Sequence, residues 1–152
     1  MATITTERPS LKVVRQYQTT PAQVWQAWTS AEALKQWMGP AGVKCLDAEA
    51  DVRVGGRYRI LMKSPDGQEH DVRGVYREIQ PNRKLVFSCS WERTHERESL
   101  VTIELRPIDT GTELTLTHEQ FVDESERDHH RQGWDGCLDS LERFITARRA
   151  RS

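Results

Sequence analysis

The sequence has few cysteines and no long apolar run. Its three cysteines, Cys45, Cys89 and Cys137, stand far apart among 152 residues, and none forms a C-x-x-C pair. This spacing argues against a disulfide framework and against a zinc knuckle, so we expect a protein of the reducing cytoplasm. No stretch approaches the roughly 20 apolar residues of a membrane-spanning helix. The opening segment, residues 1–10, also lacks the apolar run of a secretory signal.

An excess of charge of one sign is missing as well. The chain has 22 Lys and Arg residues against 23 Asp and Glu residues, for a formal net charge of -1. Because both signs are interspersed, no basic face is expected, and nucleic acid is not a predicted partner. Hydrophobic residues make up 36% of the chain, which favours amphipathic elements over a fully buried parallel sheet. We predict a single domain, residues 1–152, with a core from about 11 to 146.

The first third of the chain predicts a strand and two short helices. Residues 11–18, LKVVRQYQ, have the β-branched and aromatic content of a strand. Thr20 and Pro21 then suit the N-cap and the first position of a helix. Ser30 is a second N-cap candidate, for a short helix over residues 31–37.

Six segments then alternate apolar and polar residues with a period of two. This alternation is typical of antiparallel strands that bury one face and expose the other. Turn sequences such as Pro65-Asp66-Gly67 separate them. The predicted strands are residues 43–54, 57–63, 70–79, 84–91, 99–107 and 112–120.

The apolar period changes from two to that of a helix after Phe121. Trp134, Leu138 and Leu141 lie on one helical stripe between residue 123 and about residue 147. A helix about 10 Å wide does not cover a sheet about 30 Å wide. We therefore expect the sheet to curl around this helix and to leave a cavity where the gap is not filled. The predicted class is α+β.

The chain contains, in this order, the motifs TTPAQVWQAWTSAEALKQWMGP, DVRVGGRYR, GVYREIQPNRKLVFS, SLVTIEL, GTELTLTHEQF and GWDGCLDSLERFI. Together these six motifs resemble the START-like (SRPBCC) superfamily. More narrowly, they are similar to its bacterial branch, which is named after the activator of a heat-shock chaperone's ATPase. The resemblance runs from about Leu11 to Ile145.

The resemblance implies a helix-grip fold, in which a curved antiparallel sheet of six or seven strands wraps around the C-terminal helix. It also implies an apolar pocket between the two. The superfamily includes lipid and hormone carriers, aromatase/cyclases and cochaperone domains, so the fold does not fix the function. A small apolar ligand is the predicted partner, and no cofactor is expected. A protein partner, or a homodimer through an edge strand near residue 45, is also compatible with the sequence.

Side chains on the inward strand faces and on the helical stripe are the predicted lining of this cavity. The alternative is that these side chains fill the core completely and leave no cavity. Tyr58, His118 and His130 are the expected polar groups of a mostly apolar site. The predicted lining is Trp37, Met38, Tyr58, Ile60, Met62, Phe87, Trp91, Val101, Ile103, Leu116, His118, Phe121, His130, Trp134, Cys137, Leu138 and Leu141.

Two other functions are weighed against ligand binding. A cyclase-like or hydrolase-like enzyme needs an acid or base in the pocket, for which His118, His130 and Tyr58 are the candidates. A protein-interaction module needs a contiguous exposed apolar patch, of which the polar outward strand faces give little sign. His118, His130 and Cys137 match no established metal motif, so no metal is predicted.

The two tryptophans near the first helices have different expected roles. Trp28 shares a helix face with Val24 and Ala27, which predicts a fixed core position. Trp37 ends a helix with little apolar support, so we expect it at the rim of the pocket, as part of an element that opens.

Overall fold

The computed structural model describes residues 10–39, 43–91, 99–119 and 124–151. Seven strands and three helices are present in these ranges, in an α+β arrangement, as predicted. In chain order the elements are β1 (Leu11–Tyr17), α1 (Pro21–Thr29), α2 (Ala31–Trp37), β2 (Lys44–Ala50), β3 (Arg57–Lys63), β4 (Glu69–Gln80), β5 (Lys84–Trp91), β6 (Ser99–Ile108), β7 (Gly111–Glu119) and α3 (Glu124–Arg151).

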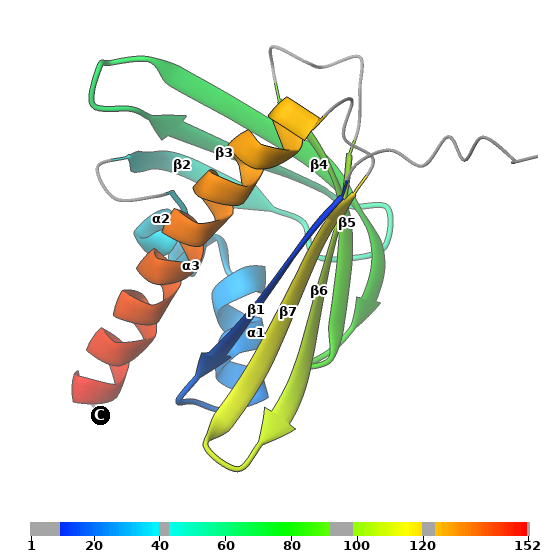
Figure 1. Ribbon diagram of the computed structural model, residues 1–152, viewed down its shortest axis with the longest axis vertical. Coiled ribbons are helices and arrows are strands. Elements are labelled where there is room, and N and C mark those ends of the chain that lie inside the picture. Colours follow the sequence, from blue (N-terminus) through cyan, green and yellow to red (C-terminus); the bar gives the residue numbers. More distant parts are fainter. Residues whose placement is uncertain (1–9, 40–42, 92–98, 120–123, 152) are drawn as a thin grey trace, which may run out of the picture.

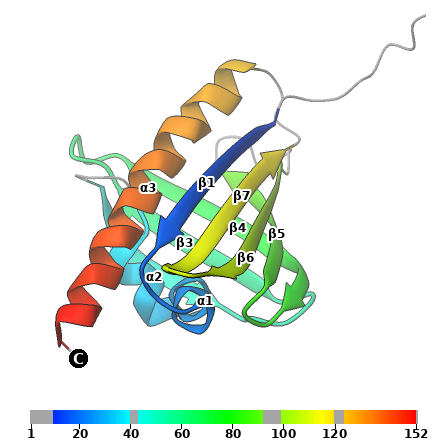
Figure 2. The ribbon, with the colours of Figure 1, turned by 60° about the horizontal axis from the view of Figure 1, so that its bottom comes forward.

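All seven strands form one antiparallel sheet in the order β1-β7-β6-β5-β4-β3-β2. Strands β2 to β7 follow one another as neighbours, whereas β1 pairs with β7 at the far side. β1 and β2 are therefore the two edges. Figure 1 and Figure 2 show the sheet curled, with the helices on its concave side.

The two short helices begin where the sequence places their caps. The Thr20 side chain accepts a hydrogen bond from the Gln23 backbone N–H, and Pro21 takes the first helical position. The Ser30 side chain does the same for the Ala33 N–H at the start of α2. Each cap satisfies one of the backbone donors that a helix start leaves without an intrahelical partner.

Helix α3 joins the two edges of the curled sheet. It packs against β1 on one side and against α2 on the other, and α2 in turn packs on β2. Helix α1 lies over β6 and β7. The sheet, α2 and α3 therefore close a ring in cross-section, with α1 and α2 together at one end of the curl (Figure 2).

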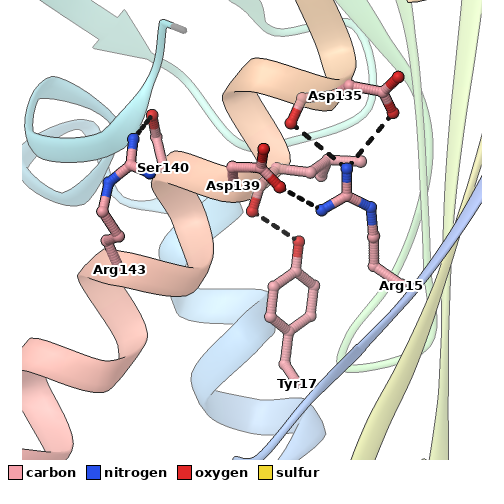
Figure 3. A network of polar contacts seen from close by, with 7 residues as sticks. Arg15, Tyr17, Asp135, Asp139, Ser140 and Arg143 are labelled. Carbon is pink, nitrogen blue, oxygen red and sulfur yellow. Dashed lines mark hydrogen bonds and ion pairs between the residues drawn. The ribbon is translucent and has the colours of Figure 1, made fainter. Parts of the chain in front are cut away.

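Polar contacts hold α3 in this position (Figure 3). From β1, the Arg15 guanidinium bonds the Asp139 carboxylate at 2.6 Å and the Asp135 carboxylate at 3.3 Å. The buried Tyr17 hydroxyl donates to the Leu138 carbonyl at 3.1 Å. On the α2 side, the Ser140 hydroxyl donates to the Gly39 carbonyl at 2.9 Å. Because these bonds attach the middle of α3 to both sides, the helix spans the sheet.

A break in the β4–β5 ladder accompanies the curl of the sheet. The Ser88 carbonyl accepts a hydrogen bond from the Tyr58 hydroxyl at 2.6 Å, and the Val75 N–H bonds the Ser88 side chain. Gly74 lies opposite Tyr58 in the β3–β4 pairing. A Cβ at Gly74 would come within 1.9 Å of the Ser88 carbonyl oxygen and 2.5 Å of the Tyr58 ring. Glycine therefore lets the ring cross β4 at this point.

The core confirms the predicted strand register. The inward residues Tyr58, Phe87, Val101, Ile103 and Leu116 are all buried, as the alternation requires. Two elements end at other residues than predicted: the strand predicted over residues 43–54 is β2, Lys44–Ala50, and α3 continues to Arg151. Within the described ranges, no helix has both the length and the apolar content to cross a membrane.

Candidate ligand-binding site

A cavity of about 790 Å³ lies between strands β3, β4 and β5 and the N-terminal half of α3. Trp28 and Leu34, from the two short helices, close one end of it. The opposite end lies by the β3–β4 turn and the start of α3, which are at the same end of the molecule in Figure 1.

The floor of the cavity consists of paired residues from β3 and β4. Ile60 lies opposite Val72, and Met62 lies opposite His70. Because side chains alternate between faces along a strand, these residues point to the same side of the sheet as Tyr58. Ile60, Met62 and Val72 are each less than 10% exposed. The floor is therefore apolar until it reaches His70.

Aromatic rings form the closed end. Trp28 lies edge-on to Trp37, with ring centroids 4.8 Å apart, and 6.0 Å from Trp134. Phe87 lies 5.3 Å from the ring of Tyr58 and 6.5 Å from that of Trp28. Such edge and tilted contacts are favourable arrangements for aromatic pairs. They give this end a rigid apolar wall.

The Trp134 wall is fixed by a hydrogen-bond chain behind it. The Trp134 indole N–H donates to His118 Nδ1 at 2.9 Å, so this nitrogen carries no proton. The proton of neutral His118 then lies on Nε2, which donates to the Ser99 hydroxyl at 2.6 Å. Ser99 donates in turn to the Cys89 carbonyl at 3.2 Å. Every member of the chain therefore has the donor or acceptor that it needs.

Two of the three candidate acid–base groups, His118 and Tyr58, are already engaged in hydrogen bonds. His118 is fully buried, and burial, together with neighbouring His130, lowers the pKa of His118 well below its ordinary value of 6.5. His118 Nδ1 already accepts the hydrogen bond from the Trp134 indole N–H. The Tyr58 hydroxyl is bonded to the Ser88 carbonyl. Tyr58 therefore forms part of the cavity wall, whereas His118 holds Trp134 in place from behind it.

The Cys137 thiol, which borders the cavity, is not activated. Cys137 is 7% exposed, and burial raises the pKa of its thiol to about 12. A nucleophilic cysteine needs the opposite shift. Among the described residues, no group of three or more His, Cys, Asp or Glu is arranged to hold a metal ion. Cys137 therefore contributes packing surface to the wall.

The open end of the cavity is polar. His70 Nε2 lies 2.7 Å from the Ser64 hydroxyl, and both side chains are partly buried. From α3, His130 is partly buried, while His129 is exposed and borders the cavity at its mouth. Burial thus decreases from Trp28 at one end to His129 at the other.

Eight of the predicted lining residues border this cavity: Met38, Tyr58, Ile60, Met62, Phe87, His130, Trp134 and Cys137. Seven others are buried in the core but do not border it: Trp37, Val101, Ile103, Leu116, His118, Leu138 and Leu141. The Trp91 side chain and Phe121 lie outside the described residues. The reason for the difference is that α1 and α3 cover the β1, β6 and β7 half of the sheet, so the cavity lies over β3, β4 and β5.

Sequence reasoning missed much of the lining. Alternation along β4 and β5 places several of these residues on the inward face, and helical spacing from His130 and Cys137 indicates Gly133. The additional lining residues are Trp28, Leu34, Val43, Ser64, Glu69, His70, Asp71, Val72, Tyr76, Leu85, Cys89, Ser125, His129 and Gly133.

The expected position of Trp37 at the pocket rim is wrong, whereas the core position expected for Trp28 is confirmed. Trp37 is 2% exposed, and its indole N–H donates to the Ala27 carbonyl at 2.9 Å. That carbonyl is in the last turn of α1, where acceptors lack intrahelical donors. Trp37 therefore joins the two short helices as a core residue. Trp28 is buried in the core, as predicted, and in addition borders the cavity.

A family model described as "Activator of Hsp90 ATPase homolog 1-like protein" matches residues 18–146. The chain belongs to this family. The START-like resemblance and the helix-grip fold predicted from the sequence are thereby confirmed. The family relationship covers all of the elements that border the cavity.

Solved structures show the same fold along nearly the whole chain. A protein from Chromobacterium violaceum is 26% identical with a TM-score of 0.83, and the match covers 90% of this chain and 96% of that one. A family member from Silicibacter pomeroyi is 23% identical with a TM-score of 0.84, covering 92% and 99%. A protein from Rhizobium leguminosarum is 26% identical with a TM-score of 0.76, covering 91% and 95%. No curated protein matches the chain significantly.

Proposed function

We propose that this protein binds a small apolar or aromatic molecule in the cavity beneath α3. The observation that carries the proposal is the volume of about 790 Å³, bounded by apolar and aromatic side chains. Protein interiors otherwise pack with few voids larger than a water molecule. Ligand sites typically measure about 300–1,000 Å³ and are mostly apolar with a few placed polar groups.

The hydrogen bonds of the wall support binding over acid–base catalysis. The His118 and Tyr58 polar atoms bond Trp134, Ser99 and Ser88, and so hold the rings in place. A wall fixed in this way is preorganised, which reduces the entropy lost when a ligand binds.

The outer surface offers less support for a protein-interaction module of the kind that the family name suggests. Among the described residues, the large apolar side chains that are exposed are Val14, Leu46 and Val54. They belong to β1, to β2 and to the loop after β2, and so are distributed over separate segments. An interaction site of this type would need a contiguous patch of several hundred Å².

Gly133 offers a direct way to test the proposal. It borders the cavity from α3, and an added Cβ would meet nothing within 4 Å. Gly133→Phe therefore places a ring in the cavity without a backbone clash. Gly133→Ala is the matched control, because it also removes the helix cost of glycine, by about 1 kcal/mol, but fills little space.

The test is a fluorescence titration with Nile red, an uncharged apolar dye. We expect the wild type and Gly133→Ala to bind the dye with affinities within about twofold of each other. Gly133→Phe should bind it at least tenfold more weakly while melting no earlier than the wild type. Unchanged dye affinity in a folded Gly133→Phe variant would show that the dye binds elsewhere, and the proposal would fail.

A further inference from the structure

We infer that the ligand is an amphipathic acid, whose apolar body fills the closed end and whose carboxylate lies among the histidines at the mouth. This inference rests on the proposed function and specifies its ligand class. It starts from an uneven distribution of polar groups. His70, His129 and His130 all border the cavity and are partly buried or exposed, whereas Trp28, Phe87 and similar rings at the closed end are buried.

The inward direction of these histidines follows from their elements. His70 occupies the same face of β4 as Val72, and it pairs with Met62 in the floor. On α3, His129 and His130 precede Gly133 by four and three residues, so they share the face of the helix that borders the cavity. Two elements that are far apart in sequence thus direct imidazoles to one end of the cavity.

The nearby carboxylates do not compete for this space. Glu69 and Asp71 border the cavity, but the period of two directs their side chains to the opposite face of β4 from His70. On that face the Asp71 carboxylate is bonded by Arg59 at 2.8 Å and by Arg73 at 2.9 Å. Both arginines hold the pKa of Asp71 down at about 2, so its charge is already compensated.

The inward polar groups match an acceptor-rich head. Imidazole N–H groups and the hydroxyls of Ser64 and Ser125 can all donate hydrogen bonds, and an imidazole can also take up a proton and become a cation. A carboxylate only accepts, and its bonds to charged donors are stronger than those between neutral groups. An ammonium head would find no inward carboxylate among the described cavity residues. The described polar groups of the cavity therefore favour an acid over an amine of the same length.

The experiment is a displacement of Nile red at pH 7 by three ten-carbon competitors: decanoic acid, decan-1-ol and decylamine. They share one apolar body and differ in the head. We expect decanoic acid to displace the dye at a concentration at least tenfold lower than decylamine and at least threefold lower than decan-1-ol. In the double variant His70→Leu/His129→Leu, the preference for acid over amine, measured as the ratio of the two displacing concentrations within that variant, should fall at least fivefold.

The control variant is Arg131→Leu, which removes a full positive charge from an exposed position of α3 without changing a cavity residue. It should keep the wild-type preference. If Nile red does not bind the wild type, the proposed function fails. If the dye binds but the acid displaces it no better than the alcohol and the amine, the inference of an acidic ligand is overturned and the proposed function stands. Retention of the preference by the double variant also overturns it. Should the double variant fail to fold, the wild-type ranking of the three competitors decides.

Discussion

Replacing His118 by glutamine should remove a pH dependence of stability that the wild-type fold carries. His118 is fully buried between Trp134 and Ser99, and it accepts the indole proton on Nδ1. Burial first, and neighbouring His130 second, lower the pKa of His118 well below 6.5. In the unfolded chain the same side chain titrates near its ordinary value of about 6.5.

The sign and the size of the effect follow from proton linkage. Well above pH 6.5 neither the folded nor the unfolded state binds a proton at His118, so the contribution of His118 to stability does not change with pH. Below pH 6.5 the unfolded chain binds one proton that the folded chain does not, and the free energy of unfolding falls by about 1.4 kcal/mol per pH unit. Between pH 6.5 and pH 5.0 the loss from this one site is at most about 2 kcal/mol, against a typical stability of about 5–15 kcal/mol.

Urea unfolding of both proteins at pH 8.0, 7.0, 6.0, 5.5 and 5.0 measures this effect. Glutamine keeps a donor and an acceptor but does not titrate, so the other histidines contribute equally to both curves. The difference in stability between wild type and variant should be nearly constant well above pH 6.5 and should shrink as the pH falls to 5.0, by at most about 2 kcal/mol. Two parallel curves over the whole range would refute the assignment of a buried neutral His118.

Four further substitutions test other parts of the structure. Trp37→Phe loses the hydrogen bond to the Ala27 carbonyl and should lower the free energy of unfolding in urea by about 1 kcal/mol. Its Nile red affinity should be unchanged, and a large change in dye binding would mean that Trp37 lies at the pocket rim after all. Gly74→Ala should destabilise by about 2–3 kcal/mol, because its Cβ overlaps the Ser88 carbonyl and the Tyr58 ring; a neutral result would mean that β4 does not approach them so closely. Leu141→Ala, fully buried, should cost about 2–5 kcal/mol, and His129→Ala, exposed, no more than about 0.5 kcal/mol; equal losses in thermal melts would contradict the assigned face of α3.

The fold could be predicted from the sequence because its signals are local. Thr20 with Pro21, and Ser30, are caps whose effect depends on the next three residues alone. Alternation along β3 and β6 places Tyr58 and Ile103 inward whatever the rest of the chain does. The width of seven strands against one helix then requires a curled sheet.

The position of the cavity depends on contacts between distant segments, and the sequence pattern carries little information about them. The bonds of Arg15 and Tyr17 to the middle turns of α3 hold this helix against β1 and not against β3. The inward face of β7 looks the same as that of β3, yet Leu116 is covered by helices and Ile60 borders the cavity. The Trp37 error has the same origin, because the carbonyl that anchors its indole belongs to another helix.

The most direct test of the central claim uses two of the chain's three methionines, Met38 and Met62, which border the cavity from different elements. With ¹³C-methyl methionine labelling, and with Met38→Leu and Met62→Leu to assign the signals, indole can be titrated while both methyl groups are observed. Binding in the cavity predicts that both signals shift along one saturable curve, and that Gly133→Phe abolishes the shift. If indole leaves both methyl signals unchanged up to its solubility limit, while Nile red still binds the protein, small apolar molecules do not enter this cavity and the account is wrong.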